Sequence, residues 1–315
     1  MRILSVLLIV SILLACCSCS KSTASKSWNL SDSESSKGKT ASDSAESESD
    51  NLNSISAGFM HSLSLSGNGK VACTGAKNEK FHGADGWTGI KKVVADYNVS
   101  IGLTDKGKIK LAGDTADLLS AATTWSDVVD FDSCDITLIA VLADGSTIAT
   151  GGTNSDGQLN SFGVTNADSV AAAADHTVVL LRDGTVMANG LNDKGQCNVS
   201  GWKNIVQIDA GVGFTIGLCS DGTCVTAGKS DSNQLDISGW TNVKAISAGC
   251  GFTVGLLSNG TCLAVGDNQN GQCNVTDWKN ITEISAGYNH VLAKQKDGKI
   301  VATGDKNAFD LKKLN

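Results

Sequence analysis

Along most of the chain, short apolar runs alternate with small polar steps that contain glycine. One unit shows this clearly, with runs at 243–248, 253–257 and 261–265 that are rich in branched residues and bounded by Gly, Asn and Asp. Runs of this length and composition are typical of β-strands. The Asn259-Gly260 step between the last two runs is a strong hairpin signal, and a two-residue turn of this kind has positive φ at both central residues. No stretch shows sustained helical periodicity, so the pattern predicts an all-β chain.

The pattern recurs with a period of about 38 residues, and such a period indicates a repeat architecture. The hairpin glycine is found at Gly69, Gly107, Gly145, Gly184, Gly222, Gly260 and Gly298. A tryptophan slot is filled by Trp87, Trp125, Trp202, Trp240 and Trp278, with Val164 in the third repeat. Short sheets at a fixed spacing predict a β-propeller, and seven repeats predict a seven-bladed one. We expect residues 52–58 to close the ring by completing the sheet in which the last repeat ends.

Two longer motifs connect the repeats to a known family. Residues 281–304 contain Ile-x-x-Ile-Ser-Ala-Gly-Tyr-Asn-His-Val-Leu and then Asp-Gly-Lys-Ile-Val-Ala-Thr-Gly. A Gly-x-Asn-x-x-Gly-Gln segment stands at 190–196 and again at 266–272. These units resemble the regulator of chromosome condensation repeats, whose proteins form seven-bladed propellers. The resemblance covers about residues 52–315 and implies a β-propeller domain over that range.

The resemblance implies two different kinds of function. The eukaryotic founder of the family exchanges nucleotide on a small GTPase at chromatin. Secreted bacterial propellers with such repeats include inhibitors that clamp class A β-lactamases with loops on one face, and an exported acidic chain is closer to these. The second and third repeats depart from the family's Ala-Gly pair, because Ala95-Asp96 and Ser133-Cys134 stand in its place.

The beginning of the chain predicts export and lipidation. Arg2 is followed by an apolar run over residues 3–15, which is too short to span a bilayer and has the layout of a signal peptide. The run ends in Leu13-Leu14-Ala15-Cys16, which resembles the bacterial lipoprotein box. We therefore expect residues 1–15 to be a signal peptide and Cys16 to carry acyl chains such as palmitate, which anchor an extracytoplasmic protein to the bacterial cell membrane. The alternative is an ordinary secretory signal.

A polar tether follows the lipidation site. There are 12 Ser in the 31 residues from Ser20 to Asp50, and such a segment cannot bury enough apolar area to offset its ordering entropy. We interpret residues 16–51 as the lipidated Cys and a disordered tether. The whole chain has a net charge of -7 and no run rich in Lys or Arg, which excludes electrostatic binding of nucleic acid. We expect a monomer.

None of the candidate motifs predicts catalysis. His61, His176 and His290 share one repeat slot, which favours a structural role as partly buried side chains bonded to backbone. His82 is expected on the surface. No calcium loop, zinc knuckle or phosphate-binding loop is complete, so we expect no metal and no cofactor. An enzyme with a site in the central channel is the weakest of the alternatives.

Eight cysteines lie beyond the tether, and an exported chain could pair them. The spacing suggests one pair. Cys219 and Cys224 flank Asp221-Gly222, and a two-residue turn would place them opposite each other on neighbouring strands. The alternative is that most of the cysteines are small buried apolar residues.

A binding face is suggested by the loop after the Ala-Gly pair, which supplies most contacts in the related inhibitor propellers. Its first residue is aromatic in three repeats that become neighbours when the ring closes, with Phe59, Tyr97 and Tyr288. The flanking candidates are Met60, Asn98, Asp135, Asp175 and Asn289. Aromatic rings with flanking amides suit a protein or glycan contact. The alternative is that the rings only cover the ends of the blades.

These observations favour a non-enzymatic, surface-anchored propeller that binds an extracellular or cell-surface protein, as an inhibitor or an adaptor. The alternative function is a carbohydrate or cell-wall binding module that uses the same loop face.

Overall fold

The computed structural model of the chain describes residues 54–76, 80–152, 154–160 and 163–315. The expected signal peptide, the lipidation site Cys16 and the tether lie outside the described residues. The helices in the described part are short: η1 (Lys80–Ala84) and η2 (Ala116–Thr124) are 3-10 helices, and α2 (Leu311–Leu314) is a single turn. Within these residues, no helix has both the length and the apolar character needed to cross a membrane.

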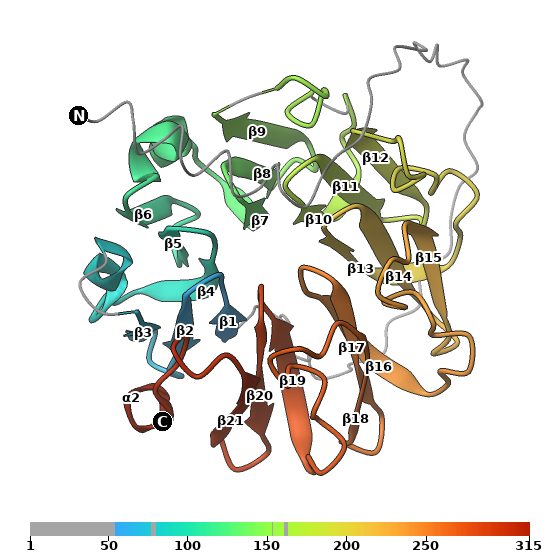
Figure 1. The fold of residues 1–315 in the computed structure, drawn as a ribbon. Helices are drawn as coiled ribbons and strands as arrows, with labels where there is room; N and C mark the ends of the chain where they lie inside the picture. Colours follow the sequence, from blue (N-terminus) through green and yellow to red (C-terminus); the bar gives the residue numbers. More distant parts are fainter. Residues whose placement is uncertain (1–53, 77–79, 153, 161–162) are drawn as a thin grey trace, which may run out of the picture. The chain divides into compact units, whose positions relative to one another are not determined.

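The described strands form seven three-stranded antiparallel sheets, arranged as blades around a common axis (Figure 1). Each blade uses three consecutive strands, the first of which is nearest the axis. The strands are β1 (Ile55–Ala57), β2 (His61–Leu65) and β3 (Val71–Gly75) in blade 1; β4 (Ile90–Ala95), β5 (Val99–Thr104) and β6 (Ile109–Gly113) in blade 2; β7 (Val128–Cys134), β8 (Thr137–Leu142) and β9 (Thr147–Gly151) in blade 3; β10 (Ala167–Ala172), β11 (His176–Leu181) and β12 (Val186–Gly190) in blade 4; β13 (Ile205–Gly211), β14 (Phe214–Cys219) and β15 (Cys224–Gly228) in blade 5; β16 (Val243–Ala248), β17 (Phe252–Leu257) and β18 (Cys262–Gly266) in blade 6; and β19 (Ile281–Ala286), β20 (His290–Gln295) and β21 (Ile300–Gly304) in blade 7. The prediction of an all-β, seven-bladed propeller is confirmed.

The hydrophobic core is divided among the seams between neighbouring blades. In the seam between blades 5 and 6, Trp240 packs with Ile216, Leu218 and Ile246. The tryptophan meets a small residue at the middle of the next blade, and a Cβ added at Gly255 would lie 2.6 Å from Trp240 Cζ3. The slot therefore serves repeat packing, because Trp87, Trp202 and Trp240 each lie against a glycine of the next blade.

The innermost strands also have free edges, which side chains of the preceding blade cover. A strand edge whose N–H groups face no partner strand costs free energy unless another acceptor is supplied. Asp132 Oδ2 accepts from Ala172 N at 2.8 Å, and Asp209 Oδ2 accepts from Ala248 N at 2.9 Å. Burial raises the pKa of Asp132 to about 7 and that of Asp209 to about 6. These carboxyl groups near the axis are thus parts of the scaffold.

The ring does not close in the way that the sequence suggested. β1 pairs with β2 of its own repeat, and blade 7 takes all three strands from the last repeat. The blade 7–blade 1 seam is instead sealed by the C-terminal segment, where Ser62 Oγ donates to Ala308 O at 2.9 Å and Ser64 Oγ donates to Leu314 O at 3.0 Å. The expectation that residues 52–58 complete the last sheet is wrong, because every blade is already complete within one repeat.

The hairpins also differ from the predicted two-residue turns. In blade 5, Gly222 N donates to Cys219 O at 2.9 Å, and Gly222 has φ +80° while Asp221 is not in the positive-φ region. The turn therefore contains four residues with glycine last, which shifts the pairing by one, so that Leu218 rather than Cys219 faces Cys224. Cys219 packs in the seam with blade 4 and Cys224 in the seam with blade 6. The predicted disulfide is absent, and both residues are free thiols in the structure.

Candidate functional site

The predicted aromatic residues form one cluster at the end of the ring where the innermost strands finish. Phe59 follows β1, Tyr97 follows β4 and Tyr288 follows β19. The ring centroids of Phe59 and Tyr97 are 4.5 Å apart, and those of Phe59 and Tyr288 are 4.6 Å apart in an edge-to-face arrangement. All three side chains are half-buried. We call these three residues the aromatic face. Their juxtaposition across blades 7, 1 and 2 is what the repeat register predicted.

Close contacts between the loops hold the aromatic face in place. Tyr288 N donates to Gly58 O at 3.0 Å, so the loop of blade 7 is bonded directly to that of blade 1. A Cβ at Gly287 would overlap the carbonyl oxygen of Gly58, and one at Gly58 would lie 3.0 Å from Ala95 Cβ. The glycine of the repeated Ala-Gly pair is thus required by the close approach of neighbouring loops, and it brings the aromatic residues within contact distance.

Asp96 takes the place of this glycine in blade 2, and sequence reasoning missed its role. The side chain is only 5% exposed. Its Oδ1 accepts from Tyr97 N at 2.5 Å and from Asp135 N at 2.7 Å, while its Oδ2 accepts from Ser133 Oγ at 2.5 Å. Burial is the main reason that the pKa of Asp96 is raised to about 7. Asp96 therefore links the loop of blade 2 to that of blade 3. The only signal in the sequence was its departure from the Ala-Gly pair.

The other predicted binding residues differ in how they are held. Met60 has 36% of its surface exposed beside Phe59. Asn98 and Asn289 are half-buried next to the two tyrosines. The Asp175 carboxylate is already engaged within the protein, because its Oδ1 lies 2.8 Å from His176 Nδ1 and its Oδ2 accepts from Gln196 Nε2 at 3.3 Å. The structure therefore assigns a scaffold role to Asp175.

Asp135 completes the cluster on the side of blade 3. Its backbone has φ +58°, and its side chain is half-buried. Asp135 N and Tyr97 N donate to the same oxygen, Asp96 Oδ1, so residues 97 and 135 lie beside each other, and the charge of Asp135 adds to the larger effect of burial in raising the pKa of Tyr97. Burial also raises the pKa of Asp135 itself. Among the described residues, no hydrogen bond or ion pair reaches the Asp135 carboxylate.

The three repeat-slot histidines are structural, although their partners are not the backbone. His61 Nε2 lies 3.1 Å from Ser100 Oγ, His176 Nε2 lies 2.9 Å from Thr215 Oγ1, and His290 Nε2 lies 2.8 Å from Ser62 Oγ. Each contact joins one blade to the next, and each ring is fully buried.

His82 is half-buried rather than on the open surface, and its Nε2 lies 3.0 Å from Ala76 O. No group of three or more His, Cys, Asp or Glu in the described part of the chain has the geometry to hold a metal ion.

The cysteines lie largely within the blades. The structure records no disulfide among the eight Cys of the described residues. Burial raises the pKa of Cys73 and of Cys262 to about 12, so these thiols stay protonated and unreactive at neutral pH. The alternative that the cysteines are small buried apolar residues thus fits Cys73 and Cys262, whereas the other six are half-buried.

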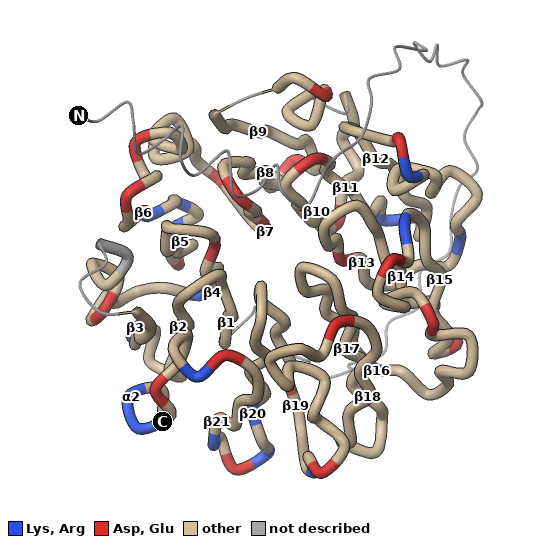
Figure 2. The backbone as a smooth tube through the Cα atoms, viewed as in Figure 1, with Lys and Arg blue, Asp and Glu red and all other residues tan. Residues whose placement is uncertain are grey.

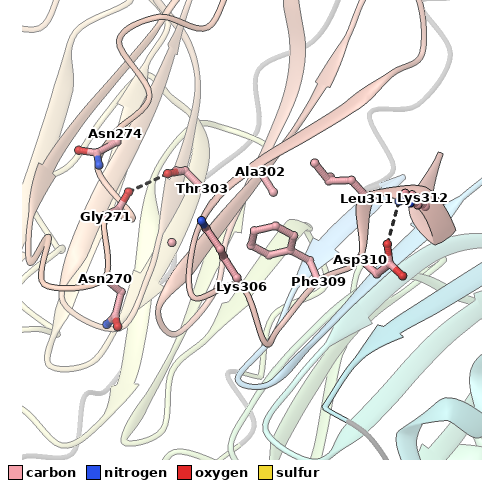
Figure 3. A pocket seen from close by; sticks show the side chains of 11 residues that line it. Asn270, Gly271, Asn274, Ala302, Thr303, Lys306, Phe309, Asp310, Leu311 and Lys312 are labelled. Atoms are coloured by element: carbon pink, nitrogen blue, oxygen red, sulfur yellow. Dashed lines mark hydrogen bonds between the residues drawn. The ribbon is translucent and has the colours of Figure 1, made fainter.

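A separate hollow of about 620 Å³ lies at the outer side of blade 7 (Figure 3). It is bounded by the turn around Gly271, by β21 and by the C-terminal segment with Phe309. Thr303 Oγ1 donates to Gly271 O at 2.8 Å across it. None of the predicted binding residues lines this hollow.

Comparison with known proteins supports the assignment of the repeats. The family profile of the regulator of chromosome condensation (RCC1) repeat matches residues 167–196 and 243–272. No curated protein matches the chain.

Several solved structures share its fold. The CRINKLY WD40 ectodomain of the Arabidopsis thaliana receptor kinase ACR4 has a TM-score of 0.68 at 15% identity, covering 80% of this chain and 95% of that one. The ectodomain of the Physcomitrella patens receptor kinase CR4 has a TM-score of 0.67 at 17% identity, covering 80% and 73%. Prp20p of Saccharomyces cerevisiae, described with its binding to Gsp1p and histones, has a TM-score of 0.60 at 16% identity, covering 79% and 81%. The described part of the chain is therefore a seven-bladed propeller in which residues 167–196 and 243–272 match the RCC1 repeat.

Proposed function

We propose that the chain is a non-enzymatic binding propeller that uses the aromatic face to hold an extracellular protein, as an inhibitor or adaptor. The observation that carries this proposal is the contact of Phe59 with both Tyr97 and Tyr288, at 4.5 and 4.6 Å between ring centroids. Aromatic side chains that are half-buried and held by rigid loops lose little entropy on binding and are typical anchors of protein interfaces.

The direction of the chain supports this use of the aromatic face. The described residues begin at Ser54, which is bonded to Glu283 at the start of β1, whereas Phe59 follows the other end of that strand. The described chain therefore enters blade 1 at the end of β1 that is opposite to Phe59. We also propose that the protein is extracytoplasmic and anchored by a lipid on Cys16, because residues 13–16 resemble a lipoprotein box.

Affinity capture tests the proposal. The full-length wild-type chain is used to capture cell-surface and secreted material, and bound proteins are identified by mass spectrometry. The Phe59→Ala, Tyr97→Ala, Tyr288→Ala variant is expected to bind the captured protein at least tenfold more weakly, because the loss of hot-spot aromatics typically costs more than 1 kcal/mol each. Circular dichroism and thermal unfolding check that the variant is folded.

The matched control removes exposed apolar side chains elsewhere on the ring. Leu118→Ala, Val129→Ala and Val206→Ala truncate residues that are 49%, 38% and 54% exposed and lie outside the aromatic face. This control variant is expected to retain binding. Equal capture by all three proteins would overturn the assignment of the aromatic face. If free sugar abolished the binding of captured material to the wild-type chain, the result would favour the carbohydrate-binding alternative.

A further inference from the structure

We propose that the aromatic face receives a protonated Lys or Arg side chain from a surface loop of its protein partner, with Asp135 as the counter-charge. This inference rests on the proposed function and names the chemistry of the partner. Three features of the described residues carry it: the arrangement of the rings, the charges of the surrounding loops and the state of the Asp135 carboxylate.

The rings provide the first feature. The faces of aromatic rings carry partial negative charge, and a cation within about 6 Å of a ring centroid is attracted by it. Phe59 and Tyr97 are tilted by 32°, while Phe59 and Tyr288 are at 76°. Rings at such different inclinations present a face and an edge side by side. This favours a side chain that inserts among them over a flat apolar surface laid across them.

The charges of the loops provide the second feature. The seven loops that join the innermost strand of each blade to its middle strand contain no Lys, Arg or His. They do contain Asp96, Asp135 and Asp175. Figure 2 shows acidic residues where β4 and β7 approach the axis. Because the loops supply negative charge without a compensating cation, a positively charged partner is complementary to this end of the ring.

The third feature distinguishes Asp135 from the other two acids. Asp96 accepts three hydrogen bonds, and Asp175 is held by His176 and Gln196. The Asp135 carboxylate has no such contact among the described residues, although Asp135 is half-buried and its N–H shares the acceptor Asp96 Oδ1 with the N–H of Tyr97. A half-buried carboxylate without a partner is costly, and an incoming cation would relieve that cost.

The same chemistry already occurs inside this protein. Lys92 Nζ lies 5.2 Å from the centroid of Phe131 and 2.5 Å from Asp130 Oδ1, close to the axis. A cation is thus held there by one ring and one carboxylate. At the aromatic face, the rings and the carboxylate are present, and the loops that carry them contain no cation of their own.

Selection from a random cyclic-peptide library tests the inference with a defined probe. The library is selected on the full-length wild-type chain, and the selected peptides are then measured on the triple alanine variant. We expect the peptides that depend on the three aromatics to be enriched in Lys or Arg. Replacement of the cation by a neutral isostere, such as citrulline for arginine, is expected to weaken binding about tenfold, in line with a desolvated cation–π contact and a charge pair.

Variants of the protein test the role of Asp135. Asp135→Asn keeps the shape, and asparagine tolerates the positive φ of this position well. It is expected to weaken the binding of the cationic peptides three- to tenfold. This loss of affinity is expected to be smaller at high ionic strength, where charge interactions are screened. Asp168→Asn removes the same charge from an exposed position at the start of β10, at the other end of the innermost strands, and is expected to change binding less than twofold.

The outcomes separate the two proposals. Peptides that need the three aromatics but lack a cation, or that are indifferent to Asp135→Asn, would overturn the cation inference and leave the aromatic face as a binding site. Peptides that bind the triple variant as tightly as the wild type, or failure to select any peptide, would count against the aromatic face itself.

Discussion

Replacing Gly255 with valine is expected to lower the free energy of unfolding by about 3 kcal/mol, through overpacking of the core. Gly255 lies in the middle of β17, and its backbone is not in the positive-φ region, so only the available space limits the side chain. A Cβ there would lie 2.6 Å from Cζ3 and 2.9 Å from Cε3 of Trp240, which is itself fixed among Ile216, Leu218 and Ile246. The ring cannot move aside without displacing the seam between blades 5 and 6.

The third repeat indicates how this change can be compensated. The tryptophan slot holds Val164 there, the corresponding slot of the next blade holds Val179, and both residues belong to one packed cluster. Trp240→Val alone is expected to cost about 3 kcal/mol by leaving a cavity. The double variant with Gly255→Val is expected to be no less stable than either single variant, because the added methyl groups occupy the space that the indole leaves.

Urea unfolding followed by circular dichroism measures these differences. Gly239→Val is the matched control, because it makes the same change at an exposed turn where no atom lies within 4 Å of the added Cβ. It is expected to stay within about 0.5 kcal/mol of the wild type. If the losses of the two single variants simply add in the double variant, then the two slots are not coupled and this account of the seam is wrong.

The repeats made the blades predictable, because each strand is bounded by its own glycine signal. The turn type was not predictable from Asp-Gly alone, since the same pair can form the whole of a two-residue turn or the last two positions of a four-residue turn. The residue after the glycine gives a local signal for the four-residue turn. Asp221 is followed two residues later by Thr223, whose N and Oγ1 both bond to Asp221 Oδ1, at 2.9 and 2.6 Å. These two bonds join the turn to the residue that follows it and support the register that separates the two cysteines.

The aromatic face was predictable for a different reason. Equivalent positions of successive repeats are neighbours around a closed ring, so Phe59, Tyr97 and Tyr288 were expected to meet once closure was assumed. The role of Asp96 depends on the distance between the loops of two blades, which the repeat pattern does not contain. The same holds for the closing seam, where Ser62 and Ser64 bond to the C-terminal segment. Sequence periodicity thus locates the blades and the slot histidines that join them, whereas Asp96, a departure from the repeat, joins the loops of blades 2 and 3.

That closing seam contains a buried histidine, and His290→Phe is expected to make the protein more resistant to acid. Burial lowers the pKa of His290 to about 4 from its ordinary value of 6.5. Between these two pH values the unfolded chain binds a proton that the folded chain does not, so the stability of the wild type falls as the pH decreases from 6.5 to 4. The phenylalanine variant lacks this contribution. Phenylalanine already occupies the same repeat slot at Phe214 and Phe252, where both rings are fully buried.

The expected result is a difference that depends on pH. The free energy of unfolding of His290→Phe, relative to the wild type, is expected to rise by about 3 kcal/mol between pH 7 and pH 4, because each unit of pKa shift corresponds to about 1.4 kcal/mol. Asp132 and Asp209 act in the opposite direction, since burial raises their pKa and the folded form gains protons on acidification. Their contributions are present in both proteins and cancel in the comparison.

Ser62→Ala separates proton linkage from the loss of a hydrogen bond. His290 Nε2 lies 2.8 Å from Ser62 Oγ, which also donates to Ala308 O at 2.9 Å, and this variant removes both contacts while it keeps the imidazole. It is expected to destabilise the protein by about 2 kcal/mol at every pH. Burial lowers the pKa of His61 to about 3, and the charge of His290 lowers it further. His61 is unchanged in both variants. If the difference in the free energy of unfolding between His290→Phe and the wild type stayed constant from pH 7 to pH 4, then His290 would take up its proton in the folded protein as readily as in the unfolded chain. The seam between blades 7 and 1 would then have to hold a charge that its buried, largely apolar surroundings do not accommodate.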